Sequence, residues 1–352
     1  MSSALRLFVF AERFLHFAAV FEHEHEHRFA EHEHPKRGWL FFGGSFAFRF
    51  VSVTIRDSSA NTFLRLSIGV PPLNNRRDFL RQTAAAGLAV SAATMPLVSK
   101  AFGNVAKAPL KLGIQLYSLR GFDVDKALKS AKDLGFEQVE FYSGMFPLDS
   151  TPEQIAAIRK KVSDLGLTIS AHGVNGFGMD QKANRKIFEF AKAAGIRNIS
   201  ADPDPKAMGL LDELVKEFDI RIGIHNHGPK HRYNKVIDTL RAIEGHDERI
   251  GACADLGHYI RSGENPVEVV RLLKGRLFGV HLKDFEKMED VTKGVILGKG
   301  HLPVKAVFEA LVATNFPADG ALSLEYEENP QDPVEDIRQC VAVARQALAD
   351  IS

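Results

Sequence analysis

Four short apolar runs in the C-terminal half of the chain each end in residue types that bind metal ions. The runs are GIHNH (223–227), ADLGHY (254–259), VHLKD (280–284) and LSLEYE (322–327). The ligand-type residues at their ends are His225, His227, Asp255, His258, His281 and Glu325. They recur at roughly 25–45 residues, about the length of one strand–helix unit. Because parallel strands in a (β/α)₈ barrel end at one common face, this spacing predicts such a barrel with a ligand cluster at its mouth.

The same alternation extends over residues 108–352. Runs typical of strands lie at 111–118, 137–142, 167–173, 196–201, 220–227, 250–257, 276–284 and 321–327, with helical apolar stripes between them. Thr151-Pro152-Glu153-Gln154 is a capping box with proline at the first helical position, so it predicts a helix start. Eight alternations predict a single α/β domain, a (β/α)₈ TIM barrel. An open doubly wound sheet is the alternative, but the first strand–helix turn lacks its glycine fingerprint.

Charge and cysteine content exclude two other classes of protein. The formal net charge is +1 over 352 residues, and no basic stripe is present, so we expect no nucleic-acid partner. The two cysteines are Cys253 and Cys340, which are too few and too far apart for a disulfide framework. We expect both in the core.

Residues 1–73 differ from the rest of the chain. They contain the only tryptophan and the run EHEHEHRFAEHEH at 22–34, and they show no regular period. A histidine-rich tract can bind metal. We favour a different interpretation, in which this stretch is a disordered tail or lies upstream of the natural start.

Residues 74–107 resemble a twin-arginine export signal. Arg76 and Arg77 are followed by Phe79 and Leu80 and then by a mildly apolar stretch rich in alanine. This predicts a periplasmic or exported protein, or a cytoplasmic one if the signal is not used. A soluble amphipathic helix is the alternative. We expect no stable membrane anchor, because the apolar stretch is short and is interrupted by polar residues and proline.

The ends of the predicted strands supply a metal site. Asp255, His281 and Glu325 end separate apolar runs, and buried polar groups that converge need either one another or a cation. A metal-free polar network is the alternative. His225 and His227 are two residues apart and therefore face the same side of a strand. One can bind the metal while the other contacts substrate.

Other residues at strand ends are weaker candidates. Glu140 and His172 end the second and third strands, and His258 follows Asp255 by three residues. We expect His172 and His258 to contact substrate. Lys283 shares the side of His281 and could polarise a carbonyl group.

At these residues the chain looks like the xylose isomerase-like TIM barrels, which include sugar phosphate isomerases and epimerases. The resemblance covers about 108–352, and its most specific parts are 255–258, 281–284 and 325–327. In ketose epimerases of this group the metal ligands are Glu, Asp, His and Glu; Asp255, His281 and Glu325 match the last three. The first position falls on His225, which removes one of the two opposed glutamates that those epimerases use. The HNH string instead resembles inosose dehydratases. Endonuclease IV shares the fold, but its larger zinc ligand set is not matched.

The resemblance implies a divalent metal (Mn, Zn, Co or Mg) bound by His225, Asp255, His281 and Glu325. It implies an isomerase or epimerase acting on a keto sugar or sugar phosphate through an enediolate. The alternatives are a dehydratase or lyase acting on keto sugars or inososes, and an endonuclease IV-like phosphodiesterase. The predicted catalytic residues are Glu325, Glu140, His227 and Lys283, and we assign Glu327 to substrate with His172 and His258. Barrels of this family often form homo-oligomers.

Overall fold

The computed structural model describes residues 50–56, 63–69 and 110–352. The chain divides into two compact units, Met1–Ala101 and Phe102–Ser352, which are described separately. In the first unit, β1 (Phe50–Arg56) pairs antiparallel with β2 (Phe63–Gly69). The histidine-rich run and the export-signal segment lie outside the described residues, so the interpretations of both stay predictions. None of the described helices is long and apolar enough to cross a bilayer.

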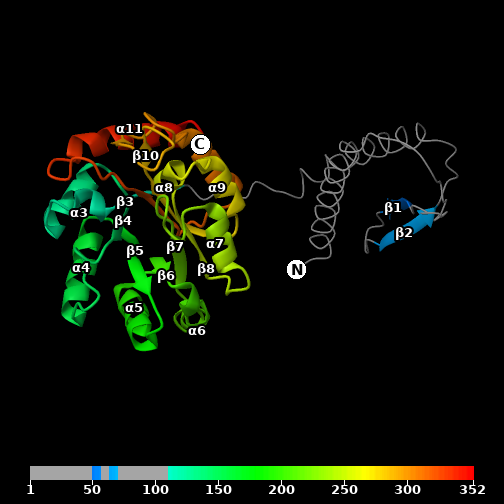
Figure 1. The fold of residues 1–352 in the computed structure, drawn as a ribbon, viewed down its shortest axis with the longest axis horizontal. Helices are drawn as coiled ribbons and strands as arrows, with labels where there is room; N and C mark the ends of the chain where they lie inside the picture. Colours follow the sequence, from blue (N-terminus) through cyan, green and yellow to red (C-terminus); the bar gives the residue numbers. More distant parts are fainter. Residues whose placement is uncertain (1–49, 57–62, 70–109) are drawn as a thin grey trace, which may run out of the picture. The chain divides into compact units, whose positions relative to one another are not determined.

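The second unit is a closed barrel of eight parallel strands, which confirms the predicted fold. The strands follow one another around the barrel in chain order, and the last pairs with both β9 and the first. Figure 1 shows the helices on the outside of these strands. The strands are β3 (Leu112–Gln115), β4 (Gln138–Phe141), β5 (Thr168–Phe177), β6 (Asn198–Pro203), β7 (Arg221–His225), β8 (Ile250–Asp255), β9 (Leu277–Leu282) and β12 (Ala321–Leu324).

Each strand is followed by at least one helix, and two connections carry extra elements. Two helices follow β8, and a short hairpin of β10 (Asp284–Phe285) and β11 (Gly294–Val295) follows β9. The α-helices are α3 (Val124–Asp133), α4 (Pro152–Asp164), α5 (Gln181–Ala194), α6 (Met208–Phe218), α7 (Val236–Ile243), α8 (Leu256–Arg261), α9 (Pro266–Leu272), α10 (Val304–Ala313) and α11 (Val334–Ala349). Short 3₁₀ turns, η1 (Leu116–Leu119) and η2 (Pro205–Ala207), precede α3 and α6.

Local signals in the sequence explain where several elements begin and end. Thr151 and Gln154 form the predicted capping box, with Pro152 as the first residue of α4. Helix α5 ends at Gly195, whose φ of 73° is the left-handed conformation that glycine adopts without strain. Both cysteines are buried and unpaired, as predicted.

The limits of the strands differ from those of the predicted runs, and three of the differences bear on the site. Strand β7 ends at His225, so His227 lies in the following loop and not on the strand. Strand β8 ends at Asp255 because its carboxylate accepts a hydrogen bond from the His258 amide (2.7 Å) and thereby caps α8. Strand β5 continues past Gly173 to Phe177, with a shift in register against β6.

We expect Thr151→Ala to lower the free energy of unfolding by about 1 kcal/mol, because the first turn of α4 loses its side-chain acceptor. Denaturant titration of the full chain measures this change. Ser163→Ala, an exposed position near the end of the same helix, is the matched control and should change stability by less than half as much. Equal effects of the two substitutions would contradict a capping role for Thr151.

Candidate metal centre

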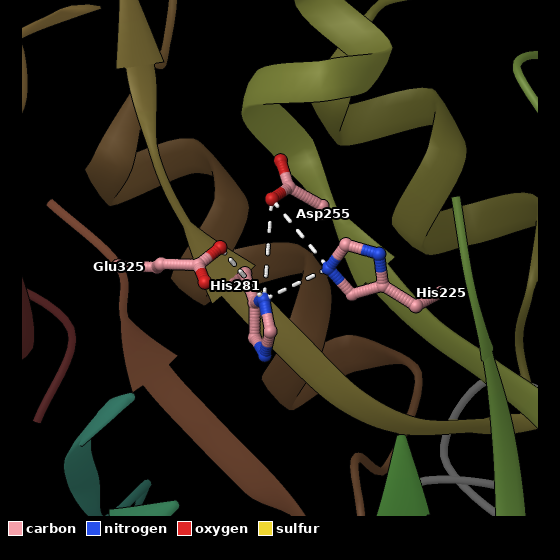
Figure 2. A group of neighbouring side chains, drawn as sticks. All are labelled: His225, Asp255, His281 and Glu325. Carbon is pink, nitrogen blue, oxygen red and sulfur yellow. Dashed lines mark hydrogen bonds and ion pairs between the residues drawn. The ribbon is translucent and has the colours of Figure 1, made fainter. Parts of the chain in front are cut away.

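Four side chains from four different strand ends meet inside the mouth of the barrel (Figure 2). They are His225, Asp255, His281 and Glu325, and one ligand atom from each lies within 4.8 Å of all the others. All four residues are buried. The His281 Nδ1 atom lies 3.1 Å from both His225 Nε2 and Glu325 Oε2. The sequence analysis placed these four residues together, and the structure brings them into one cluster.

The backbone around Asp255 is held by its neighbour strand. The Asn226 side chain accepts a hydrogen bond from the Asp255 amide (2.8 Å) and donates one to the Asp255 carbonyl oxygen (2.9 Å). Asn226 follows the last residue of β7, so this reciprocal pair of hydrogen bonds joins the end of β7 to the end of β8. It therefore sets the distance between His225 and Asp255, whose Nε2 and Oδ2 atoms are 3.7 Å apart.

Glu140 lies below the cluster, in the interior of the barrel. Its carboxylate is fully buried and contacts His281 Nε2 at 3.1 Å. Ser200 and Ser323 donate hydrogen bonds to its two oxygens at 2.5 and 2.7 Å. A carboxylate that accepts the Nε2 proton leaves Nδ1 directed at the cluster, which is the arrangement found behind metal-bound histidines.

Charge balance at the cluster fits a divalent cation. Glu140, Asp255 and Glu325 are three buried carboxylates, whereas Lys283 is the one buried lysine beside them. His281, whose pKa is held well above its usual value, balances a second carboxylate, so one negative charge remains, and burying unpaired charge is costly. The donors are two imidazoles and two carboxylates, a set that suits Zn²⁺ and similar first-row metals. The Asp255 Oδ2 atom is also buried without a well-formed hydrogen bond.

The same charges shift the pKa values of the cluster. Burial opposes ionisation of Glu325, but Lys283 and His281 hold the pKa of this carboxyl group well below its usual value. Burial also opposes protonation of His281, yet Cys253, Glu140 and Glu325 hold its pKa well above the usual value. The pKa of His225 is lowered well below its usual value by burial and by the neighbouring His281. Glu325 is thus ionised and His225 neutral at neutral pH, as metal ligands must be, whereas His281 is protonated and would have to release a proton to bind a metal.

A cavity of about 310 Å³ opens above the cluster. His225 and Glu325 form part of its wall, together with several residues that sequence analysis assigned to catalysis or substrate: His227, His258, Lys283 and Glu327. Tyr117 and Tyr142 also line it, with their rings packed edge to face at a centroid distance of 5.3 Å. The remaining lining residues are Gln115, Ser143, Gly173 and Val174.

Two of the residues predicted for catalysis or substrate binding, Glu140 and His172, are not among those that line the cavity. Glu140 is directed at His281, as described above. His172 is buried, and its ring nitrogens contact the Phe146 carbonyl oxygen (2.9 Å) and the Asn175 side chain (3.1 Å). In this conformation neither residue has a free polar atom for a ligand in the cavity.

Several lining residues were missed in the sequence analysis. Gln115 and Tyr142 lie at the ends of the first two strands, whose runs were recognised, but neither is a metal-ligand type. Tyr117 lies in η1, and Val174 lies in the extension of β5. The position of Gln115 and Tyr142 at the ends of strands could have identified them as lining residues. They were missed because only residue types that bind metal were considered at those ends.

Comparison with known proteins agrees with this fold. Residues 205–346 match a family model described as the xylose isomerase-like TIM barrel. An inosose dehydratase from Clostridium botulinum is 26% identical over 203 residues, which cover 52% of this chain and 65% of that protein. The matched region is thus just under two thirds of the relative's length.

Solved structures match the barrel over nearly their whole length. An uncharacterised protein from Parabacteroides distasonis is 28% identical, with a TM-score of 0.53, and the match covers 69% of this chain and 99% of that one. The IOLI protein, solved with a zinc atom, is 18% identical with a TM-score of 0.55, over 69% and 98% of the two chains. The predicted resemblance to xylose isomerase-like barrels is confirmed.

We expect Glu140→Gln to weaken Zn²⁺ binding by about 10–100-fold, because His281 loses the charged acceptor that orients its ring. Competition with a chromophoric chelator measures the affinity. Glu137→Gln, an exposed position three residues earlier, removes the same charge without touching the cluster and should bind like the wild type. Wild-type affinity in Glu140→Gln would show that His281 needs no carboxylate behind it.

Proposed function

We propose that this chain, a xylose isomerase-like TIM barrel, is a divalent-metal-dependent lyase acting on a small keto polyol. The reaction removes a proton beside the carbonyl group and expels a β-hydroxyl group as water. His225, Asp255, His281 and Glu325 would hold a divalent metal, which would supply Lewis-acid polarisation of the carbonyl group and stabilisation of the negative charge that develops beside it. The observation that carries the proposal is a buried two-histidine, two-carboxylate cluster at the base of a cavity that also holds a neutral imidazole, His227.

His227 is the side chain best placed to move the proton. It lines the cavity, and its pKa is lowered by burial and then by the neighbouring His231, so the ring is neutral at pH 7. A neutral imidazole can take the proton from carbon and return it to the departing hydroxyl group, which leaves as water. One group then serves both halves of an elimination.

His258 supplies a hydrogen-bond donor on the same wall. Its Nδ1 atom lies 3.4 Å from Arg261 Nη1 and accepts from that guanidinium, so the proton of the neutral ring is on Nε2. Burial lowers the pKa of His258 to about 4, which keeps the ring neutral. We assign the Nε2–H group to a substrate oxygen.

The identity of the first ligand favours elimination over epimerisation. Resemblance to ketose epimerases implies two opposed glutamates for proton transfer, and here His225 takes the place of one of them. The name of the Clostridium relative, inosose dehydratase, supports the same choice. Isomerisation or epimerisation is the second candidate, because Glu325 also lines the cavity and offers a second proton-transfer group.

The cavity suits an uncharged ligand better than a phosphorylated one. Among the described residues that line it, Lys283 is the one cationic side chain, and it already contacts three carboxylates. A phosphate group would face Glu327, and none of the described lining residues is an arginine; the Arg120 guanidinium beside them already donates to the Glu327 carbonyl oxygen (2.6 Å). The volume lies at the lower end for ligand sites, as expected for a single sugar or cyclitol ring. The same lack of basic residues disfavours a phosphodiesterase.

Incubation of the metal-loaded protein with inososes and ketohexoses in D₂O tests the reaction. We expect consumption of one of these substrates, an unsaturated or diketo product, and deuterium at the carbon beside the carbonyl group; a chelator should abolish all three. His227→Ala should lower kcat by about 10²–10⁴-fold, the usual contribution of a general base. His246→Ala, a histidine on the loop before β8 that pairs with Asp212, is the control. Full activity in Asp255→Ala and His281→Ala would refute the metal-dependent mechanism.

Isothermal titration with matched ligands tests the charge of the substrate. A keto polyol should bind the metal-loaded protein at least tenfold more tightly than its phosphate ester, because the ester meets uncompensated carboxylates. Glu327→Gln removes one of these negative charges, so it should improve binding of the phosphate ester and reduce the difference in affinity between the two ligands. Tighter binding of the ester to the wild type would contradict the assignment.

A further inference from the structure

Lys283 is an internal cation in contact with the metal ligands themselves. Its side chain is 5% exposed, and its Nζ atom lies 2.9 Å from Asp255 Oδ2 and 2.7 Å from Glu325 Oε2. Those carboxylates are two of the four residues in the cluster. A third contact, 2.9 Å long, joins Nζ to Glu327 Oε1, which lies outside the cluster.

The ammonium group satisfies these carboxylates incompletely. Asp255 Oδ2 is buried and makes no hydrogen bond of good geometry, although Lys283 Nζ is near it. An ammonium group has three protons to share among three acidic partners, and their directions are set by one flexible stem. The negative charge on Asp255 Oδ2 is therefore only partly compensated, and a second cation can bind there.

Lys283 and a bound metal must compete for the same oxygens. A divalent cation binds carboxylate oxygens at roughly 2 Å, whereas the ammonium group already lies against the same two atoms. Two cations that share ligands in a buried site repel strongly. Glu327 can keep the ammonium group paired when that group moves away from the metal ligands. It lies two residues beyond Glu325, outside the cluster, and its side chain is 40% exposed.

We propose that Lys283 is a built-in counter-cation that occupies the metal ligands in the metal-free protein and sets the affinity of the site for divalent ions. When metal binds, the ammonium group withdraws from Asp255 and Glu325 and keeps its contact with Glu327. Lys283 thus stabilises the barrel without metal and lowers the affinity of the site for metal, and Glu327 holds the ammonium group when metal is bound. The inference rests on the metal-binding part of the proposed function.

Metal affinity in variants of the full chain tests this role directly. Lys283→Met keeps an unbranched side chain but removes the charge, so Zn²⁺ and Mn²⁺ should bind at least tenfold more tightly in chelator competition. Glu327→Gln should weaken binding severalfold, because Lys283 is then held only by the metal ligands. The double variant should bind like Lys283→Met. Lys230→Met removes an exposed lysine that pairs with Asp290 and should leave the affinity unchanged.

Thermal unfolding provides a second readout. Metal-free Lys283→Met should unfold at a lower temperature than the wild type, since two buried carboxylates lose their cation, and added metal should raise its Tm by more than it raises the wild-type Tm. If the methionine variant fails to fold without metal, the affinity measurement is made on Lys283→Gln, which should bind metal more tightly than the wild type, and on Glu327→Gln, which should bind it more weakly.

Two failures can be told apart. A wild-type chain that binds no divalent ion would overturn the metal-dependent function and this inference together. A wild-type chain that binds metal, with equal or weaker affinity in both Lys283 variants, would overturn the counter-cation role alone. Weaker binding in Lys283→Met would mean that the lysine supports the metal site instead of competing with it.

Discussion

Buried negative charge that is not fully compensated is the constraint around which the mouth of this barrel is arranged. Glu140, Asp255 and Glu325 come from three different strands and are all buried. A buried carboxylate persists only with partners, because loss of its hydration costs several kcal/mol. Each has its own set: two serines and His281 for Glu140, the amide of α8 and Lys283 for Asp255, and His281 and Lys283 for Glu325. The candidate metal site is the place where these partners still leave a negative charge without a matching positive one.

His281 connects the two levels of this arrangement. Its Nε2 atom contacts Glu140 in the barrel interior, and its Nδ1 atom lies in the cluster. The ring thus links a carboxylate that no ligand in the cavity can reach to the atoms that would hold a metal. This explains how a residue as deep as Glu140 can affect the chemistry at the mouth without contacting substrate.

One short run, 281–284, performs three tasks because successive side chains of a strand point in different directions. His281 and Lys283 face the cluster, whereas Asp284 turns to the following loop. The Asp284 carboxylate accepts hydrogen bonds from five backbone amides, those of Phe285, Gly298, Gly300, His301 and Leu302. A side chain at Gly300 would lie 2.1 Å from the Phe285 carbonyl oxygen, so the loop packs closely against its anchor. The loop after β9 is therefore anchored at Asp284, in β10, directly after His281 and Lys283.

The choice of His225 over His227 as the fourth member of the cluster came from the family resemblance. The sequence by itself determined the order of strands and helices, the start of α4, and the other three residues of the cluster. These depend on local periodicity, on capping and on the rule that parallel strands end at one face, all of which a single segment contains. Only the tertiary structure decided how deep each strand-end residue lies. Glu140 and His172 follow the same pattern as His225, yet they are enclosed by Ser200, Ser323, Phe146 and Asn175. Depth depends on the stagger between neighbouring strands in the closed barrel, such as the register shift between β5 and β6, and no single strand carries that information.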